Sequence, residues 1–306
     1  MDKHPSVAII ILNWNGWRDT LNCVSSCQKL SWPNYSILVV DNGSTDDSEK
    51  YLRQNLPADV AIIQSGANLG FAGGNNHGIR RAIQGGAEYV WLLNNDTEVD
   101  PEALTCLVAA MENGPEVGIA GSKIYYFDNP RTIWFAGGMW RKGRLHWLQR
   151  GANQTDDGQF DQLTTVDAVS GCSMLVRSAA IHKIGLMDEN FFLYWEDTEW
   201  CARAQKYDYQ VVFVPQSRVW HKISVSTVQS SFSQYYYFTR NGFFFLRQYD
   251  LWMIPVFCLY NVLFGLKSLM TGNIQPLRGL AHGCTDFMRG RKGPVASSFN
   301  THLQKK

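Results

Sequence analysis

The 306-residue sequence lacks several features that identify common classes of protein. Its seven cysteines include no CxxC pair and are odd in number, so neither a zinc ribbon nor a disulfide framework is indicated. Neither GxGxxG nor GxxxxGK[ST] occurs, which argues against a dinucleotide dehydrogenase and a nucleotide hydrolase. Because 28 basic residues nearly balance 27 acidic ones, no strong field favours nucleic acid as a partner.

A secretory signal is also missing, since no signal-peptide pattern precedes the first apolar run. We therefore expect a cytoplasmic protein, working on the cytosolic side of a membrane. The hydrophobic content of 45% is enough to bury a sizeable core, which excludes disorder as a global description. One large domain, or one domain with an appendage, is expected.

Apolar runs alternate with helical patterns over the first hundred residues. Four runs are typical of buried strands, at residues 7–12, 36–40, 60–64 and 89–93. Helical spacing occupies residues 17–30, and Asp46 can cap a helix that ends near Asn55. The alternation predicts a doubly wound α/β sheet with helices on both faces.

Polar residues follow three of these strands, namely Asn13, Asp41 and Asp96. Ligands of doubly wound sheets bind where the carboxyl ends of the strands open into a crevice. Ordinary turn chemistry accounts for any one of these residues alone. Asn94-Asn95-Asp96 nevertheless places a carboxylate where Mg²⁺ or Mn²⁺ can be shared with a bound diphosphate, with an Asx turn as the alternative.

Residues 68–76 are rich in glycine and precede a predicted helix. Their backbone N–H groups are expected to face an anion at the start of that helix. The alternative is a set of glycines chosen only for tight turns.

A further group of acidic residues begins at Asp188 and includes Trp195-Glu196-Asp197, just before a helix predicted at residues 200–206. Acidic residues at a helix N-terminus also occur simply because they favour the helix dipole. Arg203 either orients one of these acids or pairs with Glu199 on the helix surface.

Residues 251–266 are almost entirely apolar, but Pro255 and Asn261 interrupt them. The stretch is shorter than the roughly 20 apolar residues that a spanning helix needs. Basic residues follow it, at Lys267, Arg289, Arg291 and Lys292. The pattern fits either a helix on a membrane surface or a buried helix that closes the domain.

Six motifs in order resemble the inverting family 2 glycosyltransferases of the GT-A fold, in particular the rhamnosyltransferase-like branch that builds surface polysaccharides. They start at Asn13, Asp41, Asn68, Asn94, Gly171 and Trp195, and the resemblance runs from residue 7 to about 226. It implies a GT-A type mixed sheet in residues 1–226, with a nucleotide-sugar half (1–100) and an acceptor half (101–226). Residues 227–306 are expected to form a C-terminal helical, membrane-associated region.

The resemblance also implies a donor, which is a dTDP- or UDP-sugar, with rhamnose as the expected cargo. It assigns donor contacts to Asn13, Asn15, Asp41, Asn68, Gly70, Asn76 and Asn95. Asp96 matches the last position of the family's DxD motif and is expected to hold Mg²⁺ or Mn²⁺. The first position is Asn94, and the missing carboxylate leaves room for His221 as a second metal ligand.

On the acceptor side, the resemblance makes Asp197 the general base, with Glu196 as the alternative. Nearby aromatic side chains such as Trp195 and Trp200 should raise the pKa of this base through desolvation. The expected acceptor is a hydroxyl of a glycan or a lipid-linked glycan. Two other readings stay open: a non-catalytic nucleotide-sugar-binding protein, which would not need the acidic pair, and a nucleotidyltransferase, which would need a basic glycine-rich loop near the first strand.

Overall fold

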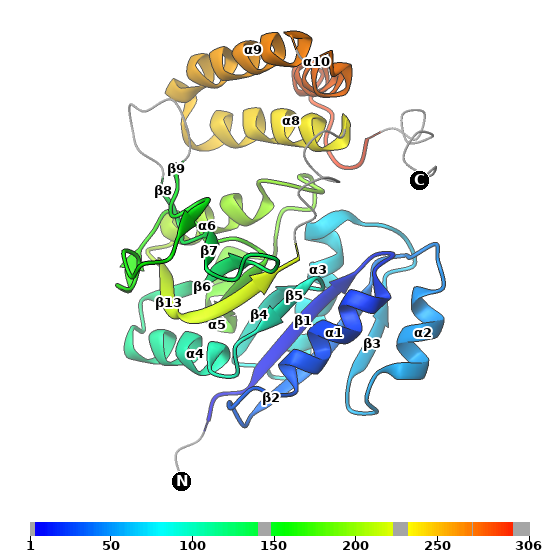
Figure 1. Cartoon of the computed structure of the whole chain (residues 1–306), viewed down its shortest axis with the longest axis vertical. Helices are drawn as coiled ribbons and strands as arrows, with labels where there is room; N and C mark the ends of the chain where they lie inside the picture. The colour runs from blue at the N-terminus through cyan, green and yellow to red at the C-terminus, as the bar shows by residue number, and fades with distance from the viewer. Residues whose placement is uncertain (1–3, 140–147, 223–231, 271, 296–306) are drawn as a thin grey trace.

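The structure, a computed structural model, describes residues 4–139, 148–222, 232–270 and 272–295 (Figure 1). An α/β part is covered at one end by three long helices (Figure 1). These are α8 (Phe232–Tyr249), α9 (Ile254–Met270) and α10 (Ile274–Met288), with the short helix η1 (Leu251–Met253) between the first two. All seven cysteines are free, as the sequence indicates.

The sheet is mixed, as expected for this fold class. Its parallel part has the order β3-β2-β1-β4, with β1 (Val7–Asn13), β2 (Tyr35–Asp41), β3 (Ala61–Gln64) and β4 (Tyr89–Asn94). β12 (Ser173–Arg177) is antiparallel to both β4 and β6 (Val117–Tyr126), and β13 (Gln210–His221) is parallel to β6. Short strands complete it: β5 (Thr97–Val99), β7 (Thr132–Phe135), β10 (Gln154–Thr155) and β11 (Thr164–Thr165), while β8 (Gly138–Met139) and β9 (Leu148–Gln149) pair separately.

Helices cover both faces of the sheet, which confirms the doubly wound prediction. In β1, Ile9 and Ile11 join one core, whereas Ala8 and Ile10 join the other, because successive side chains of a strand point to opposite faces. The first core lies beneath α1 (Trp17–Cys27), α2 (Ser48–Asn55) and α4 (Ala103–Asn113). The second lies beneath α3 (Gly70–Gln84), α5 (Ser178–Ile184) and α6 (Glu196–Lys206).

Two element boundaries differ from the prediction near the strand ends. α3 begins at Gly70, so the glycine-rich segment forms the first turns of the helix and not a loop before it. α6 begins at Glu196, so the acidic pair lies inside the first turn. The segment before β12 contacts α6, because Gly171 N–H donates to Asp197 and the Gln205 amide donates to the Val166 carbonyl.

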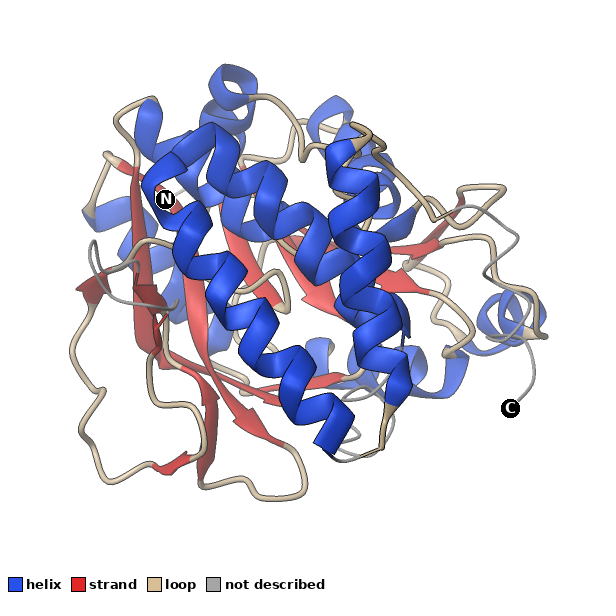
Figure 2. Ribbon diagram, turned by 90° about the horizontal axis from the view of Figure 1, so that it is seen from above, coloured by secondary structure: helices blue, strands red, loops and turns tan. Residues whose placement is uncertain are grey.

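The three C-terminal helices lie side by side over the α/β part when seen from above (Figure 2). Gly279 and Gly283 let α10 approach the backbone of α8, since a Cβ at either position would lie within 2.8 Å of an α8 carbonyl oxygen. The expected boundary at 226/227 falls outside the described residues. The apolar stretch is longer than predicted, because η1 and α9 together run from Leu251 to Met270, and its 20 residues are enough in length and composition to cross a membrane.

Candidate active site

The polar ends of β1 and β2 lie together, as predicted. Asn13 pairs in register with Asp41, and Asn94 at the end of β4 is level with Leu12. The Asn13 amide donates a hydrogen bond of 2.8 Å to Asp41 Oδ1, and the Thr20 hydroxyl donates one of 2.8 Å to Asn13 Oδ1. The parallel strands thus place an amide and a carboxylate at the carboxyl edge, where a nucleoside can bind.

Asn15 and Asn95 lie around this pair. Asn15 adopts a left-handed conformation (φ 54°), and its side-chain oxygen accepts a 2.8 Å hydrogen bond from the backbone N–H of Thr45. The Asn95 amide donates to the Thr20 hydroxyl at 3.0 Å. Both asparagines therefore help to shape the loops that follow β1, β2 and β4.

The start of α3 does not offer the free N–H groups that the sequence led us to expect. The N–H groups of Leu69 and Gly70 donate to the side-chain oxygens of Asn42 and Asn68, at 3.0 and 2.9 Å. Phe71 N–H donates to the carbonyl of Phe192 at 2.6 Å. Because these donors have protein partners, the prediction of an anion held by this segment was wrong for these three residues.

Close packing explains the glycines of α3 instead. Gly70 has a φ of 72°, and a Cβ there would lie 2.2 Å from the carbonyl oxygen of Phe192. A Cβ on Gly74 would lie 2.5 Å from Leu12, and one on Gly78 would lie 2.6 Å from Ile10. These glycines allow the helix to lie directly on β1.

Asn76, another predicted donor contact, is fully buried in α3. Its amide donates to the Met187 carbonyl and to Glu189, both at 2.9 Å, and its oxygen accepts from Met187 N–H at 3.1 Å. The side chain therefore holds residues 187–189 in place and has no donor left for a nucleotide sugar.

His221 lies next to Asp96 although 124 residues separate them, because β13 pairs with β5. His221 Nε2 is 3.0 Å from Asp96 Oδ1, and the Asn94 amide is 3.4 Å from the same nitrogen. Burial lowers the pKa of His221, but the Cys172 thiol and the Asp96 carboxylate outweigh it and raise the pKa to about 10.

This pair fits a divalent ion only if the substrate supplies further ligands. Within the described ranges, no cluster of three or more His, Cys, Asp or Glu side chains is arranged to hold a metal. Magnesium-like ions are commonly held by one or two carboxylates, with phosphate oxygens and waters at the other positions. Asp96 and His221 match that requirement, and the side chain of Asn94 lies beside them.

The acidic pair divides into a buried and an accessible member. Glu196 is 4% exposed, and its Oε2 has no hydrogen-bond partner among the residues that the structure describes. Burial and the neighbouring charge of Asp197 raise the pKa of Glu196 well above its ordinary value. This shift favours the neutral form of Glu196, so the more exposed Asp197 is the better candidate for the reactive carboxylate.

Asp197 is partly exposed, and its carboxylate is held from two sides. It accepts hydrogen bonds from Gly171 N–H at 3.0 Å and from Thr198 N–H at 2.6 Å. Burial raises the pKa of Asp197, while these hydrogen bonds oppose the rise. The result is an oriented carboxylate with an increased proton affinity, which is what a general base requires.

Residues 171–172 connect the two halves of the site. Gly171 donates to Asp197, and the carbonyl of Cys172 accepts a 3.0 Å hydrogen bond from the N–H of Asn94. Gly171 and Cys172 therefore connect the candidate base, Asp197, to Asn94, which lies beside the Asp96–His221 pair. Arg203 is not part of this site, because it forms a two-pronged ion pair with Glu199, as one of its predicted alternatives stated.

The sequence analysis did not identify the contribution of α8. Asn241 is fully buried and donates to three carbonyls of the segment that leads into the acidic pair. The detectable signal was a polar pair, Arg240-Asn241, inside an otherwise aromatic and apolar run.

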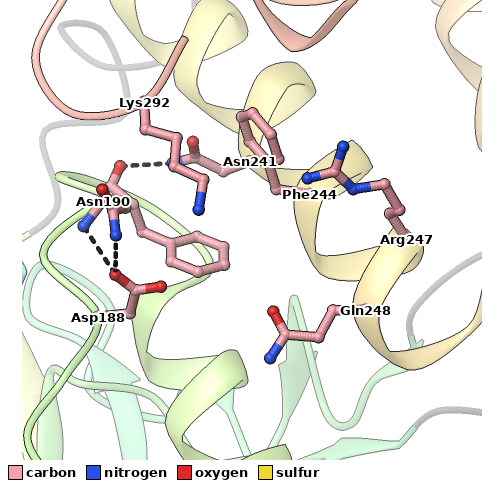
Figure 3. A pocket seen from close by; sticks show the side chains of 8 residues that line it. Asp188, Asn190, Asn241, Phe244, Arg247, Gln248 and Lys292 are labelled. Carbon is pink, nitrogen blue, oxygen red and sulfur yellow. Dashed lines mark hydrogen bonds between the residues drawn. The ribbon is translucent and has the colours of Figure 1, made fainter. Parts of the chain in front are cut away.

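A polar cavity of about 80 Å³ lies between α8 and residues 188–191 (Figure 3). Arg247, Lys292 and Asp188 point towards it from different segments (Figure 3). None of the predicted site residues lines it.

Comparison with known proteins places these observations in context. Residues 8–184 match glycosyl transferase family 2. The chain is 26% identical to the dTDP-rhamnosyl transferase RfbF of Shigella flexneri, over 80% of this chain and 81% of the relative. It is 28% identical to the N-acetylglucosaminyl-diphospho-decaprenol L-rhamnosyltransferase of Mycobacterium tuberculosis, over 72% and 78%.

A low-salt glycan biosynthesis hexosyltransferase of Haloferax volcanii is 29% identical, but the match spans 65% of this chain and only 62% of that relative. Among solved structures, GalNAc-T7 with UDP, GalNAc and Mn²⁺ has a TM-score of 0.64 at 17% identity, covering 99% of this chain and 59% of that one. A mannosyltransferase of Pyrobaculum calidifontis with GDP-Man and Mn²⁺ has a TM-score of 0.58 at 12% identity, covering 99% and 80%. Both confirm the GT-A type of fold.

Proposed function

Because the chain belongs to glycosyl transferase family 2, we propose that it transfers a sugar from a nucleoside-diphosphate donor to an acceptor hydroxyl with inversion at the anomeric carbon. One observation carries this proposal. The strand-end pair Asn13–Asp41, the Asp96–His221 pair and the oriented Asp197 open on the same edge of the sheet, linked through residues 171–172.

In this proposal residues 1–100 bind the donor and residues 101–226 bind the acceptor. Asp41, which Asn13 orients through its amide, contacts the nucleoside, and the loops shaped by Asn15 and Asn95 surround it. Asp96 and His221 would hold Mg²⁺ or Mn²⁺, which neutralises charge on the departing diphosphate when it is bound. The two rhamnosyltransferase relatives favour a dTDP-sugar with rhamnose as the cargo, and the UDP in the GalNAc-T7 structure leaves a UDP-sugar as the alternative.

The chemical step is a single displacement. Asp197 takes the proton of the acceptor hydroxyl, and the oxygen forms a bond to the anomeric carbon. The bond between that carbon and the diphosphate oxygen breaks, and the nucleoside diphosphate leaves with the electron pair. The raised pKa of Glu196 favours its neutral form, which reduces the negative charge beside the base.

The test compares the two carboxylates in a transfer assay with dTDP-rhamnose and UDP-sugars. Asp197→Asn should lose at least 10²-fold in kcat, the usual contribution of a general base, while its Kd for the donor nucleotide changes little. Glu196→Gln should stay active because the raised pKa of Glu196 already favours its neutral form. The anomeric configuration of the product, read by NMR, should be inverted. Full activity of Asp197→Asn, or retention of configuration, would reject the mechanism, and nucleotide binding without transfer would favour a non-catalytic binding protein.

The same proposal places the enzyme at the inner face of the cell membrane, acting on a lipid-linked glycan. The pattern of α9 supports this, because its buried positions are Asn261, Gly265 and Ser268, whereas most of its exposed positions are apolar and Lys267 is the exposed charge. Only 22% of the Leu251–Met270 window is buried, so the helix does not close a core. The exposed apolar side chains there include Trp252, Leu259, Val262, Leu263, Leu266, Leu269 and Met270.

An anionic bilayer is the partner that this surface fits. Residues 251–285 contain no aspartate or glutamate, while Lys267 and Arg278 lie within them and three more basic residues follow at 289–292. α9 is tied to α8 through a 3.1 Å hydrogen bond from the Thr239 hydroxyl to Asn261. We therefore propose that α9 lies in the plane of the membrane surface and does not cross the membrane.

A further inference from the structure

The segment that leads into the acidic pair has an unusual backbone. Phe192, Tyr194 and Trp195 have φ values of 64°, 65° and 75°, in the left-handed region that favours glycine. Non-glycine residues keep such conformations only where the surroundings hold them in place. Glu196 and Asp197 follow directly, and the Trp195 carbonyl accepts the hydrogen bond that starts α6, from Glu199 N–H at 2.8 Å. The direction of Asp197 therefore depends on this segment.

One side chain of α8 contacts three carbonyls of the segment. The Asn241 amide donates to the carbonyls of Phe191, Leu193 and Tyr194, at 2.7, 2.8 and 3.0 Å. Arg240 Nε donates to Asn241 Oδ1 at 3.0 Å, which fixes the amide with its NH₂ group towards these carbonyls. Both residues are fully buried.

The remaining carbonyl of the segment faces the donor side. Phe192 accepts its hydrogen bond from Phe71 N–H at the start of α3. The segment is thus held by hydrogen bonds to α3 on one side and to α8 on the other. A loss of the contacts to α8 would release the acceptor side without touching the strand ends that bind the nucleotide.

We propose that Asn241 is a positioning residue, which holds residues 191–195 so that Asp197 points at the acceptor hydroxyl, and that Arg240 orients Asn241. This inference rests on the proposed transfer function. In this proposal α8 contributes to the active site, although it lies outside residues 8–184, which match the family.

The experiment compares Asn241→Ala with Thr239→Val in the full chain. Thr239 is an equally buried residue of α8 whose hydroxyl bonds to α9, so its loss is a matched control for a missing buried hydrogen bond. Asn241→Ala should lower kcat about 10²-fold, the cost of a misplaced catalytic group, with an unchanged Kd for the donor nucleotide. Its acid limb of kcat should move to lower pH, because a released Asp197 is better solvated. Thr239→Val should change neither quantity.

Arg240→Lys is the milder variant if Asn241→Ala does not fold, and it should lower kcat in the same direction by a smaller factor. Unchanged kcat and acid limb in folded Asn241 and Arg240 variants would overturn the inference, as would an equal loss in Thr239→Val. Amide exchange separates this outcome from a failure of the proposed function. Even if the wild-type chain transfers no sugar, residues 192–197 should exchange faster in Asn241→Ala than in Thr239→Val, and equal exchange would also overturn it.

Discussion

The outward face of α9 gives a prediction that can be worked through in numbers. The perturbation is the double substitution Leu263→Glu with Leu266→Glu. These side chains are 57% and 53% exposed, so the change should leave the packing of α9 on α8 and α10 intact. Only the binding of the chain to a bilayer should suffer.

The magnitude follows from the exposed area. Full burial of a leucine side chain is worth roughly 1.5–3 kcal/mol, and the bilayer would cover only the exposed half, so each leucine contributes about 1 kcal/mol. A charge near an anionic surface is worth about 1 kcal/mol, and each glutamate adds that repulsion. The two substitutions together should cost about 4 kcal/mol, which corresponds to a fall in membrane affinity of about 10³-fold.

The assay is flotation of the full chain with phosphatidylcholine vesicles that do or do not contain phosphatidylglycerol. The wild-type chain should float with the anionic vesicles, whereas the double variant should stay in the soluble fraction. The matched control is Leu163→Glu with Tyr207→Glu, because these side chains are 55% and 52% exposed and lie in the α/β part. The control should float like the wild type.

Equal flotation of the α9 variant and the wild type would refute the reasoning. Gel filtration tests a second explanation for the exposed apolar face of α9. If the wild type is a dimer that the α9 variant abolishes, and neither floats, the apolar face contacts a second copy of the chain and not a membrane.

Other predictions concern stability and pH. Asp156→Ala should lower the free energy of unfolding by about 1.5–3 kcal/mol, because it removes one of the two carboxylates that pair with the buried Lys123, while Asp161 remains. Burial raises the pKa of Asp156, but hydrogen bonds outweigh it and lower the pKa overall. The contribution of Asp156 to stability is therefore present above the ordinary aspartate pKa and is lost as pH falls. In urea unfolding, the difference in stability between the wild type and Asp156→Ala should accordingly become smaller in acid. For catalysis, the raised pKa of Asp197 predicts that kcat falls in acid with an apparent pKa above that of an ordinary aspartate. An apparent pKa at or below the ordinary aspartate value would contradict the assignment of Asp197 as the base. Finally, Gly70→Ala should lower the free energy of unfolding more than Gly86→Ala in the same urea assay. Both glycines have a φ above +70°, but only a Cβ on Gly70 would clash with a backbone carbonyl. Equal losses of stability would show that the backbone moves to avoid the clash without an energetic cost.

The fold and the strand-end residues could be predicted because their causes are local. Continuous apolar runs indicate buried parallel strands, and the polar residues after them must meet at one edge of the sheet. Asn13, Asp41 and Asp96 were placed on this basis, and the structure puts Asn13 against Asp41 as expected. The neighbour of Asp96, His221, came from the resemblance alone, since pairing between β5 and β13 leaves no mark in the sequence.

The glycine-rich start of α3 could not be interpreted correctly because glycine has several uses. Its N–H groups looked available for an anion, but the structure shows that Phe192 approaches Gly70 and that β1 packs against Gly74. Asn76 was placed with the donor contacts for the same reason. Only its distant partners at residues 187–189 show that it is structural.

The role of α8 could not be predicted from the sequence, for another reason. Asn241 acts on carbonyls about 50 residues away, and a backbone carbonyl has no sequence signature. The length of the apolar segment was also underestimated, because Lys267 and Ser268 interrupt the pattern while the helix continues to Met270.

The central claim is that the carboxyl edge of the sheet binds a nucleoside diphosphate together with a metal ion. The most direct test is calorimetric titration of the chain with dTDP, UDP and GDP, each with and without Mn²⁺. The account predicts that one nucleotide binds, that Mn²⁺ strengthens its binding, and that Asp96→Ala removes this metal dependence. Failure of all three nucleotides to bind, or binding that neither Mn²⁺ nor Asp96→Ala affects, would contradict it.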